Sequence, residues 1–72
     1  MGESSVVMYS VDGEMYTVDN IPEGASLRCY DAMGRMLWRA DNVGESYSFS
    51  NGREMFFLQV EVAGKVVTLK GV

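Results

Sequence analysis

Hydrophobic and polar side chains alternate along most of this chain, in short runs that Gly, Asn and Asp residues interrupt. Alternation with a period of two is typical of β-strands that bury one face. The run 46–50 alternates without error, with Tyr47 and Phe49 on one face. No segment longer than a turn has the periodicity of an amphipathic helix. The pattern therefore predicts an all-β protein.

Two turn signals predict the pairing of four strands. Asp12-Gly13 is typical of a type I′ hairpin turn, and it sets Tyr9 opposite Tyr16 on the core face with Met8 on the other. The predicted core face of this hairpin consists of Val7, Tyr9, Val11, Tyr16 and Val18. A tight turn at Ala63-Gly64 sets Leu58 opposite Leu69 and Val60 opposite Val67. The uncharged run 55–60 is expected to be a central strand, because at an edge it would be a pairing hazard, with an edge-paired or swapped homodimer as the alternative.

Further strands are expected at about 26–30 and 35–40, and Pro22 places 19–25 in a connecting loop. Seven short antiparallel strands at even spacing favour a small, immunoglobulin-like β-sandwich over an open barrel. We expect residues 1–72 to form one such module, the C-terminal fragment of a longer secreted protein. A chain of this length buries only about 60% of its unfolded surface, so its stability margin is small.

The stretch 27–38 is predicted to be a hairpin around Asp31-Ala32-Met33-Gly34. Asp suits the start of a type I turn, Gly suits a left-handed bulge position, and Asp31 then lies opposite Arg35. Counting back from the turn sets Cys29 opposite Leu37 and Arg28 opposite Trp38. In this register Tyr30, Met36 and Trp38 point outward beside Arg28.

Composition excludes several functions. A net charge of −4 with six Lys and Arg argues against binding nucleic acid, and no apolar run is long enough to span a membrane. The chain has no His and one Cys, so Ser-His and Cys-His catalysis and thiolate or imidazole metal sites lack their groups. The acidic residues lie mainly in turns, and those at 41–45 match no calcium-loop spacing. We therefore expect no catalytic residues, no metal and no cofactor.

The outward side chains are the candidate functional residues. Aromatic and Met side chains on both the 27–38 hairpin and the 54–62 strand, including Met55 and Phe57, are expected to leave the core. A small monomer seldom exposes such a cluster. Cover by neighbouring loops, a face that docks on a partner or a preceding domain, and a carbohydrate-stacking platform are the three interpretations, and docking accounts best for the cluster.

The order of motifs resembles the C-terminal sorting domains of the type IX (Por) secretion system. Tyr30-Asp31-Ala32-Met33-Gly34-Arg35 matches the Tyr-Asp-x-x-Gly-Arg motif of that family, and an aromatic strand, Gly64-Lys65 and a Lys-containing strand through Lys70 follow. Two positions depart from the family pattern. Glu54 stands where the family has a glycine, and the chain closes on Gly71-Val72 rather than on a basic residue.

The resemblance implies a non-catalytic sorting or anchoring domain that crosses the outer membrane from the periplasm with its cargo, to be secreted or held at the cell surface. Its partners would be the secretion machinery or the preceding domain. The expected recognition residues are Arg28, Tyr30, Asp31, Gly34, Arg35, Met36, Trp38, Lys65 and Lys70. The alternative is an accessory interaction or carbohydrate-binding module of a surface protein.

Overall fold

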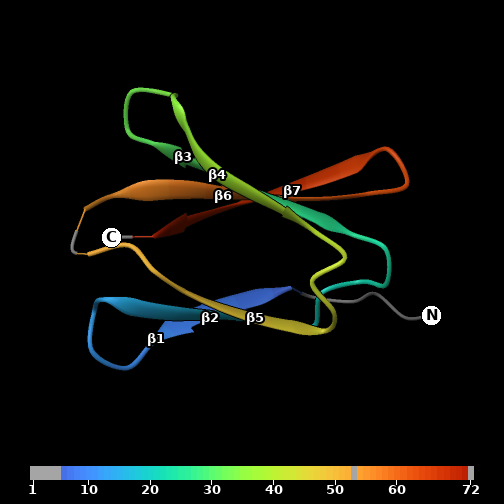
Figure 1. Cartoon of the computed structure of the whole chain (residues 1–72), viewed down its shortest axis with the longest axis horizontal. Coiled ribbons are helices and arrows are strands. Elements are labelled where there is room, and N and C mark those ends of the chain that lie inside the picture. The colour runs from blue at the N-terminus through green and yellow to red at the C-terminus, as the bar shows by residue number, and fades with distance from the viewer. Residues whose placement is uncertain (1–5, 53, 72) are drawn as a thin grey trace.

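The computed structural model describes residues 6–52 and 54–71, which form two antiparallel sheets stacked face to face (Figure 1). One sheet has three strands in the order β1-β2-β5, and the other has four in the order β4-β3-β6-β7. The strands are β1 (Val7–Ser10), β2 (Met15–Asp19), β3 (Ser26–Asp31), β4 (Met36–Asp41), β5 (Ser46–Ser50), β6 (Phe56–Val62) and β7 (Lys65–Gly71). The predicted all-β sandwich of seven strands is confirmed.

The strand order is immunoglobulin-like. β2 lies between β1 and β5 in one sheet, while β3 and β6 form the middle of the other. The fourth strand pairs with β3, whereas in immunoglobulin constant domains it joins the opposite sheet. The 55–60 run falls mainly in β6, which has neighbours on both sides, so its predicted central position is confirmed.

Aromatic rings from both sheets meet at the centre of the sandwich. The Phe56 ring lies edge-on to Tyr16 at 4.9 Å and to Phe49 at 5.5 Å between ring centroids. Leu27, Cys29 and Leu58 are fully buried beside them. Burial raises the pKa of the Cys29 thiol to about 11, because the thiolate loses its hydration there. Cys29 is thus a buried structural thiol of the core.

The end of β7 packs against this core at Gly71. Gly71 is the cross-strand partner of Phe56 and is itself buried. A Cβ atom at Gly71 would lie 2.1 Å from Cζ of Phe56, far inside van der Waals contact. The absence of a side chain at Gly71 is therefore what lets the Phe56 ring lie across the last strand.

One predicted hairpin register is right and another is wrong. Leu58 pairs with Leu69 and Val60 with Val67, as the Ala63-Gly64 turn predicts. In the first hairpin, however, Tyr9 pairs with Thr17 rather than with Tyr16. Met8 therefore packs on the core, and three residues predicted to lie inside, Val7, Tyr9 and Val11, are exposed.

The Asp12 side chain accounts for the error in the first hairpin. Its Oδ1 accepts hydrogen bonds from the backbone N–H groups of Glu14 and Met15 at 2.8 and 2.9 Å, and Ser10 Oγ accepts one from Gly13 at 2.9 Å. Of Asp12 and Gly13 only Gly13 has a positive φ, so the turn is not type I′. The wider turn moves the register by one residue, and a shift of one residue exchanges the two faces of β1.

Candidate docking face

The turn between β3 and β4 is organised by the carboxylate of Asp31. Its Oδ1 accepts hydrogen bonds from the backbone N–H groups of Met33 and Arg35, both at 2.9 Å, and its Oδ2 accepts one from Arg35 Nε at 2.9 Å. Gly34 has φ +89°, which an L side chain rarely adopts, and its N–H donates to the Asp31 carbonyl. Asp31 and Gly34 thus build the turn, while the Arg35 side chain remains 77% exposed.

These bonds alter the acidity of Asp31. The backbone N–H of Arg35, helped by its guanidinium and by the N–H of Met33, holds the pKa of the Asp31 carboxyl below its usual value. The carboxylate therefore stays ionised at neutral pH and keeps the turn closed. The predicted pairing of Asp31 with Arg35 is confirmed by the Asp31 N–H···O=C Arg35 bond of 2.9 Å.

A bulge in β4 changes the direction of Trp38. Tyr30 pairs with Met36, but Cys29 pairs with Trp38, so Leu37 is an extra residue in β4. The predictions that Cys29 faces Leu37 and that Trp38 points outward are therefore wrong. Trp38 packs against the core, with its ring 5.0 Å from Phe49 and 5.7 Å from Tyr47. Leu37 is half exposed in its place.

Four side chains form a row across the outer face of the four-stranded sheet. The pairs Met36–Tyr30, Tyr30–Phe57 and Phe57–Lys70 are direct cross-strand neighbours. Neighbours of this kind project from the same face of a sheet, here the face opposite to buried Cys29 and Leu58. We call Met36, Tyr30, Phe57 and Lys70 the outer row. It lies beside the Asp31–Arg35 turn and combines three apolar residues with one cation.

A charged row lies next to it. Arg28 pairs with Arg39 on one side and with Gln59 on the other. The Arg28 guanidinium donates to Glu61 Oε1 at 2.6 Å, and Arg39 lies 3.2 Å from Asp41 Oδ2. A hydrogen bond from the Ser26 hydroxyl lowers the pKa of the Asp41 carboxyl, and the positive charge of Arg39 lowers it further. The predicted site residue Arg28 thus flanks the outer row with its charge already paired.

The structure does not bring all the predicted recognition residues together. Lys65 pairs with Val62, whose side chain packs on the core, so Lys65 and Lys70 project to opposite faces of β7. Trp38 lies inside. The outer row and the adjoining turn therefore retain Tyr30, Asp31, Gly34, Arg35, Met36 and Lys70 of the predicted set, with Arg28 at their margin.

A cleft of about 450 Å³ adjoins the same turn. Asp31, Arg35 and Leu37 line one side, and a second loop lines the other with Asn51, Gly52, Glu54 and Met55. Asn51 holds that loop, because its N–H donates to the Glu14 carbonyl and its Nδ2 to the Glu54 carbonyl, both at 3.1 Å. The residue pair Asn51-Gly52 is typical of a turn, but no pattern in the sequence indicates that this loop meets the Asp31 turn across the sandwich.

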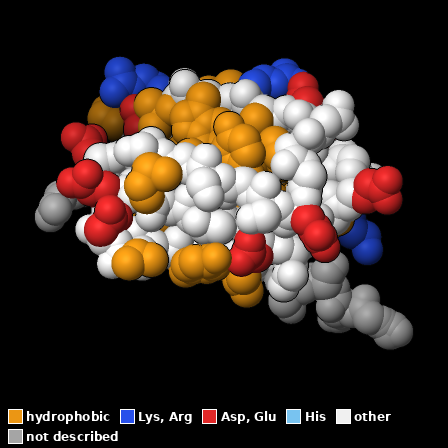
Figure 2. All heavy atoms as spheres, turned by 60° about the horizontal axis from the view of Figure 1, so that its bottom comes forward, with side chains coloured by type: hydrophobic (Ala, Val, Ile, Leu, Met, Phe, Trp, Pro, Cys, Tyr) orange, Lys and Arg blue, Asp and Glu red, His pale blue; other side chains and the backbone are white. Residues whose placement is uncertain are grey.

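The apolar surface is not confined to the outer row. Figure 2 shows one larger patch of hydrophobic side chains in the upper middle of the face it presents, other hydrophobic side chains standing apart from it, and Asp and Glu side chains toward both sides. Leu37, Met55 and Met36 are among the large hydrophobic residues that are 37–49% exposed. The prediction that Met55 lies at the surface is consistent with this exposure.

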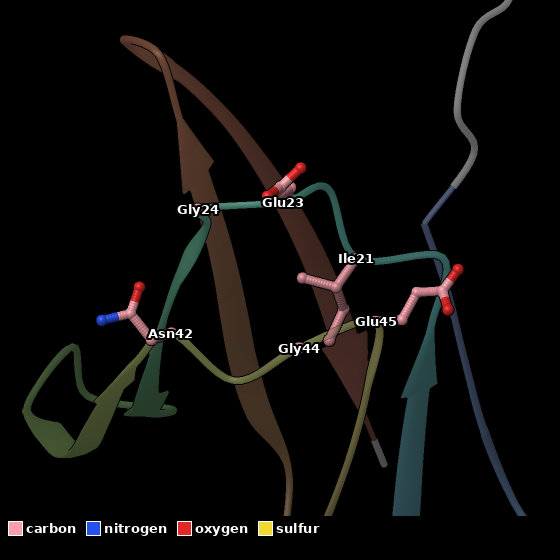
Figure 3. Close-up of a pocket in the computed structure, with 6 residues that line it drawn as sticks. All are labelled: Ile21, Glu23, Gly24, Asn42, Gly44 and Glu45. Carbon is pink, nitrogen blue, oxygen red and sulfur yellow. The ribbon is translucent and has the colours of Figure 1, made fainter.

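A second cleft, of about 500 Å³, lies at the opposite end of the sandwich. Ile21, Glu23, Gly24, Asn42, Gly44 and Glu45 line it, and in Figure 3 the side chains of Glu23, Asn42 and Glu45 diverge from one another. The Ile21 N–H donates to the Glu45 carbonyl at 3.1 Å and joins the two loops. Across 6–52 and 54–71, no group of three or more His, Cys, Asp or Glu residues is placed to hold a metal ion.

Comparisons with protein-family models, curated proteins and solved structures gave no match to this chain. Within the described residues, no helix is long and apolar enough to cross a membrane. The candidate functional features of this chain are therefore the outer row, the Asp31–Arg35 turn and the cleft between them and the Asn51 loop.

Proposed function

We propose that this chain is a non-catalytic C-terminal sorting and anchoring module, which directs a secreted or cell-surface protein across the outer membrane by the type IX (Por) route. The observation that carries the proposal is the Asp31–Arg35 turn. The Asp, Gly and Arg positions of the Tyr-Asp-x-x-Gly-Arg motif each have a physical task here: Asp31 binds three N–H groups, Gly34 takes the left-handed conformation, and Arg35 completes the ion pair.

The surroundings of the turn support a recognition role. A docking surface needs a few anchoring apolar or aromatic side chains with polar groups at its rim. Met36, Tyr30 and Phe57 supply the anchors, Lys70 and Arg35 supply cations at the rim, and the cleft beside Met55 adds depth. The partner would be a component of the secretion machinery or the preceding domain of the same protein.

A fusion experiment tests the proposal. A reporter followed by residues 1–72 is expressed in a bacterium that has the type IX machinery, and the reporter is measured in the periplasm, at the cell surface and in the medium. We expect export beyond the outer membrane. A reporter that stays in the periplasm while the module is folded contradicts the sorting function.

Two matched variants separate recognition from folding. Met36→Ser with Tyr30→Ser alters the outer row, while Lys65→Ser alters the opposite face of β7 near the Ala63-Gly64 turn. Both should retain the far-UV spectrum and cooperative unfolding of the parent. Export should fall for the outer-row variant and remain for Lys65→Ser; equal export of the two would exclude the outer row as the recognition surface.

The second candidate is a carbohydrate-binding module, which the half-buried Trp38–Tyr47 pair favours. Stacking on a sugar needs an open aromatic face, and both rings are only partly buried although Trp38 also contacts Phe49. Trp38 is the single tryptophan of the chain, so its fluorescence reports any sugar that reaches this pair. A saturable change in that fluorescence on titration with one glycan class would favour this candidate over sorting.

A further inference from the structure

The four outermost strands of the sandwich differ in how they prevent pairing with another chain. β1 has four residues and β5 has five, and β4 is interrupted by the Leu37 bulge. Short edge strands and bulges both disfavour edge-to-edge association. β7 has neither protection: it has seven residues and pairs with β6 in one continuous register from Lys65 to Gly71. Among the described residues β6 is its one strand neighbour.

The middle of β7 is apolar and exposed. Val66 and Val67 are 50% and 46% exposed, although the side chain of Val67 lies on the core side of the strand. No proline or acidic residue interrupts the strand, and its lysines stand near the ends, at Lys65 and Lys70. The contact between Gly71 and Phe56 holds the far end of the strand against the core. β7 therefore offers a fixed row of unpaired backbone groups together with apolar side chains.

We propose that the free edge of β7 pairs with β7 of a second copy of this chain, antiparallel and about a two-fold axis at Thr68. This register sets Lys65 opposite Gly71, Val66 opposite Lys70 and Val67 opposite Leu69. It uses the whole strand and keeps the core faces of both copies on the same side. The two four-stranded sheets then join into one sheet of eight strands.

The positions of the lysines disfavour the neighbouring register. A shift by one residue would set Lys65 of each copy opposite Lys70 of the other, and like charges directly opposite destabilise a strand pair. That shift would also turn the core face of one copy toward the outer face of the other. In the proposed register each lysine has an uncharged residue opposite, and Val67 of each copy is covered by the other strand.

The proposed contact between the two β7 strands is small. Seven residues from each copy are far fewer than the about 20 to 30 residues a side of a standard stable interface. We therefore expect a reversible dimer that forms as concentration rises toward about 1 mM, and a monomer at about 10 μM. The proposal is independent of the sorting function, because it depends on the free edge of β7, which shares only Lys70 with the outer row.

A cysteine placed on the two-fold axis tests both pairing and register. In Thr68→Cys the two new thiols lie directly opposite each other, within the span that a disulfide bridges. Cys29 is fully buried and does not compete. Under mild oxidation we expect Thr68→Cys to form a disulfide-linked dimer much faster than Ser50→Cys, which places a thiol on the β5 edge strand. Equal rates for the two variants would overturn the proposal.

Association without a cross-link gives the second measurement. The unmodified chain is followed by sedimentation velocity from about 10 μM to about 1 mM. Val67→Lys should abolish the concentration dependence, while Val11→Lys, the same change in charge at a fully exposed turn, should leave it intact. A chain that stays monomeric throughout, or a dimer that survives Val67→Lys, would contradict pairing through β7.

Discussion

The two sheets present very different outer faces. On the three-stranded sheet, hydroxyl and carboxylate groups bond to one another: Tyr9 donates to Asp19 at 3.0 Å, Ser46 donates to Asp19 at 2.7 Å, and Thr17 and Ser48 lie 3.1 Å apart. On the four-stranded sheet, the outer row sets three apolar side chains side by side, next to a row of charges. The first face bonds its polar groups to one another beside the separate exposed side chains of Val7 and Met15, whereas the second sets its apolar side chains in one continuous row that a partner can cover.

The sheets also contribute unequally to the core. Fully buried residues come from β2, β3 and β6, and two of these strands belong to the four-stranded sheet. The four-stranded sheet therefore has two tasks, one on each face. Changes to its inner face should affect stability, and changes to its outer face should affect binding.

Phe56→Ala should have the largest effect on stability. Phe56 contacts rings from the opposite sheet, and its truncation should cost about 3–5 kcal/mol of the free energy of unfolding. A chain of this size has about 4–11 kcal/mol in total, so the variant should unfold at low urea concentration. Val7→Ala, on the exposed face of the other sheet, should cost less than about 0.5 kcal/mol. Similar urea midpoints for the two variants would contradict the division.

Gly71→Ala should destabilise the domain by about 1–3 kcal/mol, because the new methyl group overlaps the Phe56 ring. Lys70→Ala is the matched control, since it removes an exposed side chain at the preceding position, and it should be nearly neutral. Thermal unfolding followed by circular dichroism measures both variants. An unchanged midpoint for Gly71→Ala would show that Phe56 does not lie across β7.

Acid should open the Asp31–Arg35 turn. The folded-state pKa of Asp31 is below its unfolded value, so the carboxylate stabilises the fold above the unfolded pKa and loses this effect as pH falls through the folded pKa. The parent should therefore be more stable than Asp31→Asn at pH 6, and the difference should shrink below about pH 4. Melting temperatures of both proteins from pH 2 to 7 measure it. A difference that is constant across this range would contradict the assigned role.

The smallest effect on stability is expected on the outer face of the three-stranded sheet, where the polar groups bond to one another. The hydrogen bond from Tyr9 to Asp19, helped by the negative charge of Asp19, raises the pKa of the Tyr9 phenol. Asp19→Asn should return that pKa toward the usual value of about 10 with little change in stability. Titration of the tyrosine ring signals by NMR measures it. An unchanged Tyr9 pKa would show that the bond does not form in solution.

The sequence predicts those parts of the fold whose registers depend on a tight turn alone. Ala63-Gly64 leaves one register for β6 and β7, so Leu58 meets Leu69 as expected. Residues with capping side chains behave differently: Asp12 binds two N–H groups and moves β1 by one residue. The alternation of Val7, Tyr9 and Val11 could not reveal this shift, because these apolar side chains are themselves suited to a core.

The candidate site was predicted only in part, again because some of its registers depend on more than a tight turn. Tyr30 and Met36 follow from the turn at Asp31 and Gly34, which the sequence displays. The inward direction of Trp38 depends on the bulge at Leu37, and that bulge leaves no mark in the pattern, since Leu37 and Trp38 are both apolar. The opposite placement of Lys65 and Lys70 could have been predicted, because five positions separate them and an odd spacing sends side chains to opposite faces.

Cys29 is a natural probe of how often the two sheets separate. It is the single cysteine of the chain, it is fully buried in β3, and its raised pKa suppresses the reactive thiolate. A thiol reagent can therefore modify it only in molecules whose sheets have separated. The modification rate, divided by that of the unfolded chain, gives the fraction of open molecules under native conditions, without denaturant or an introduced label.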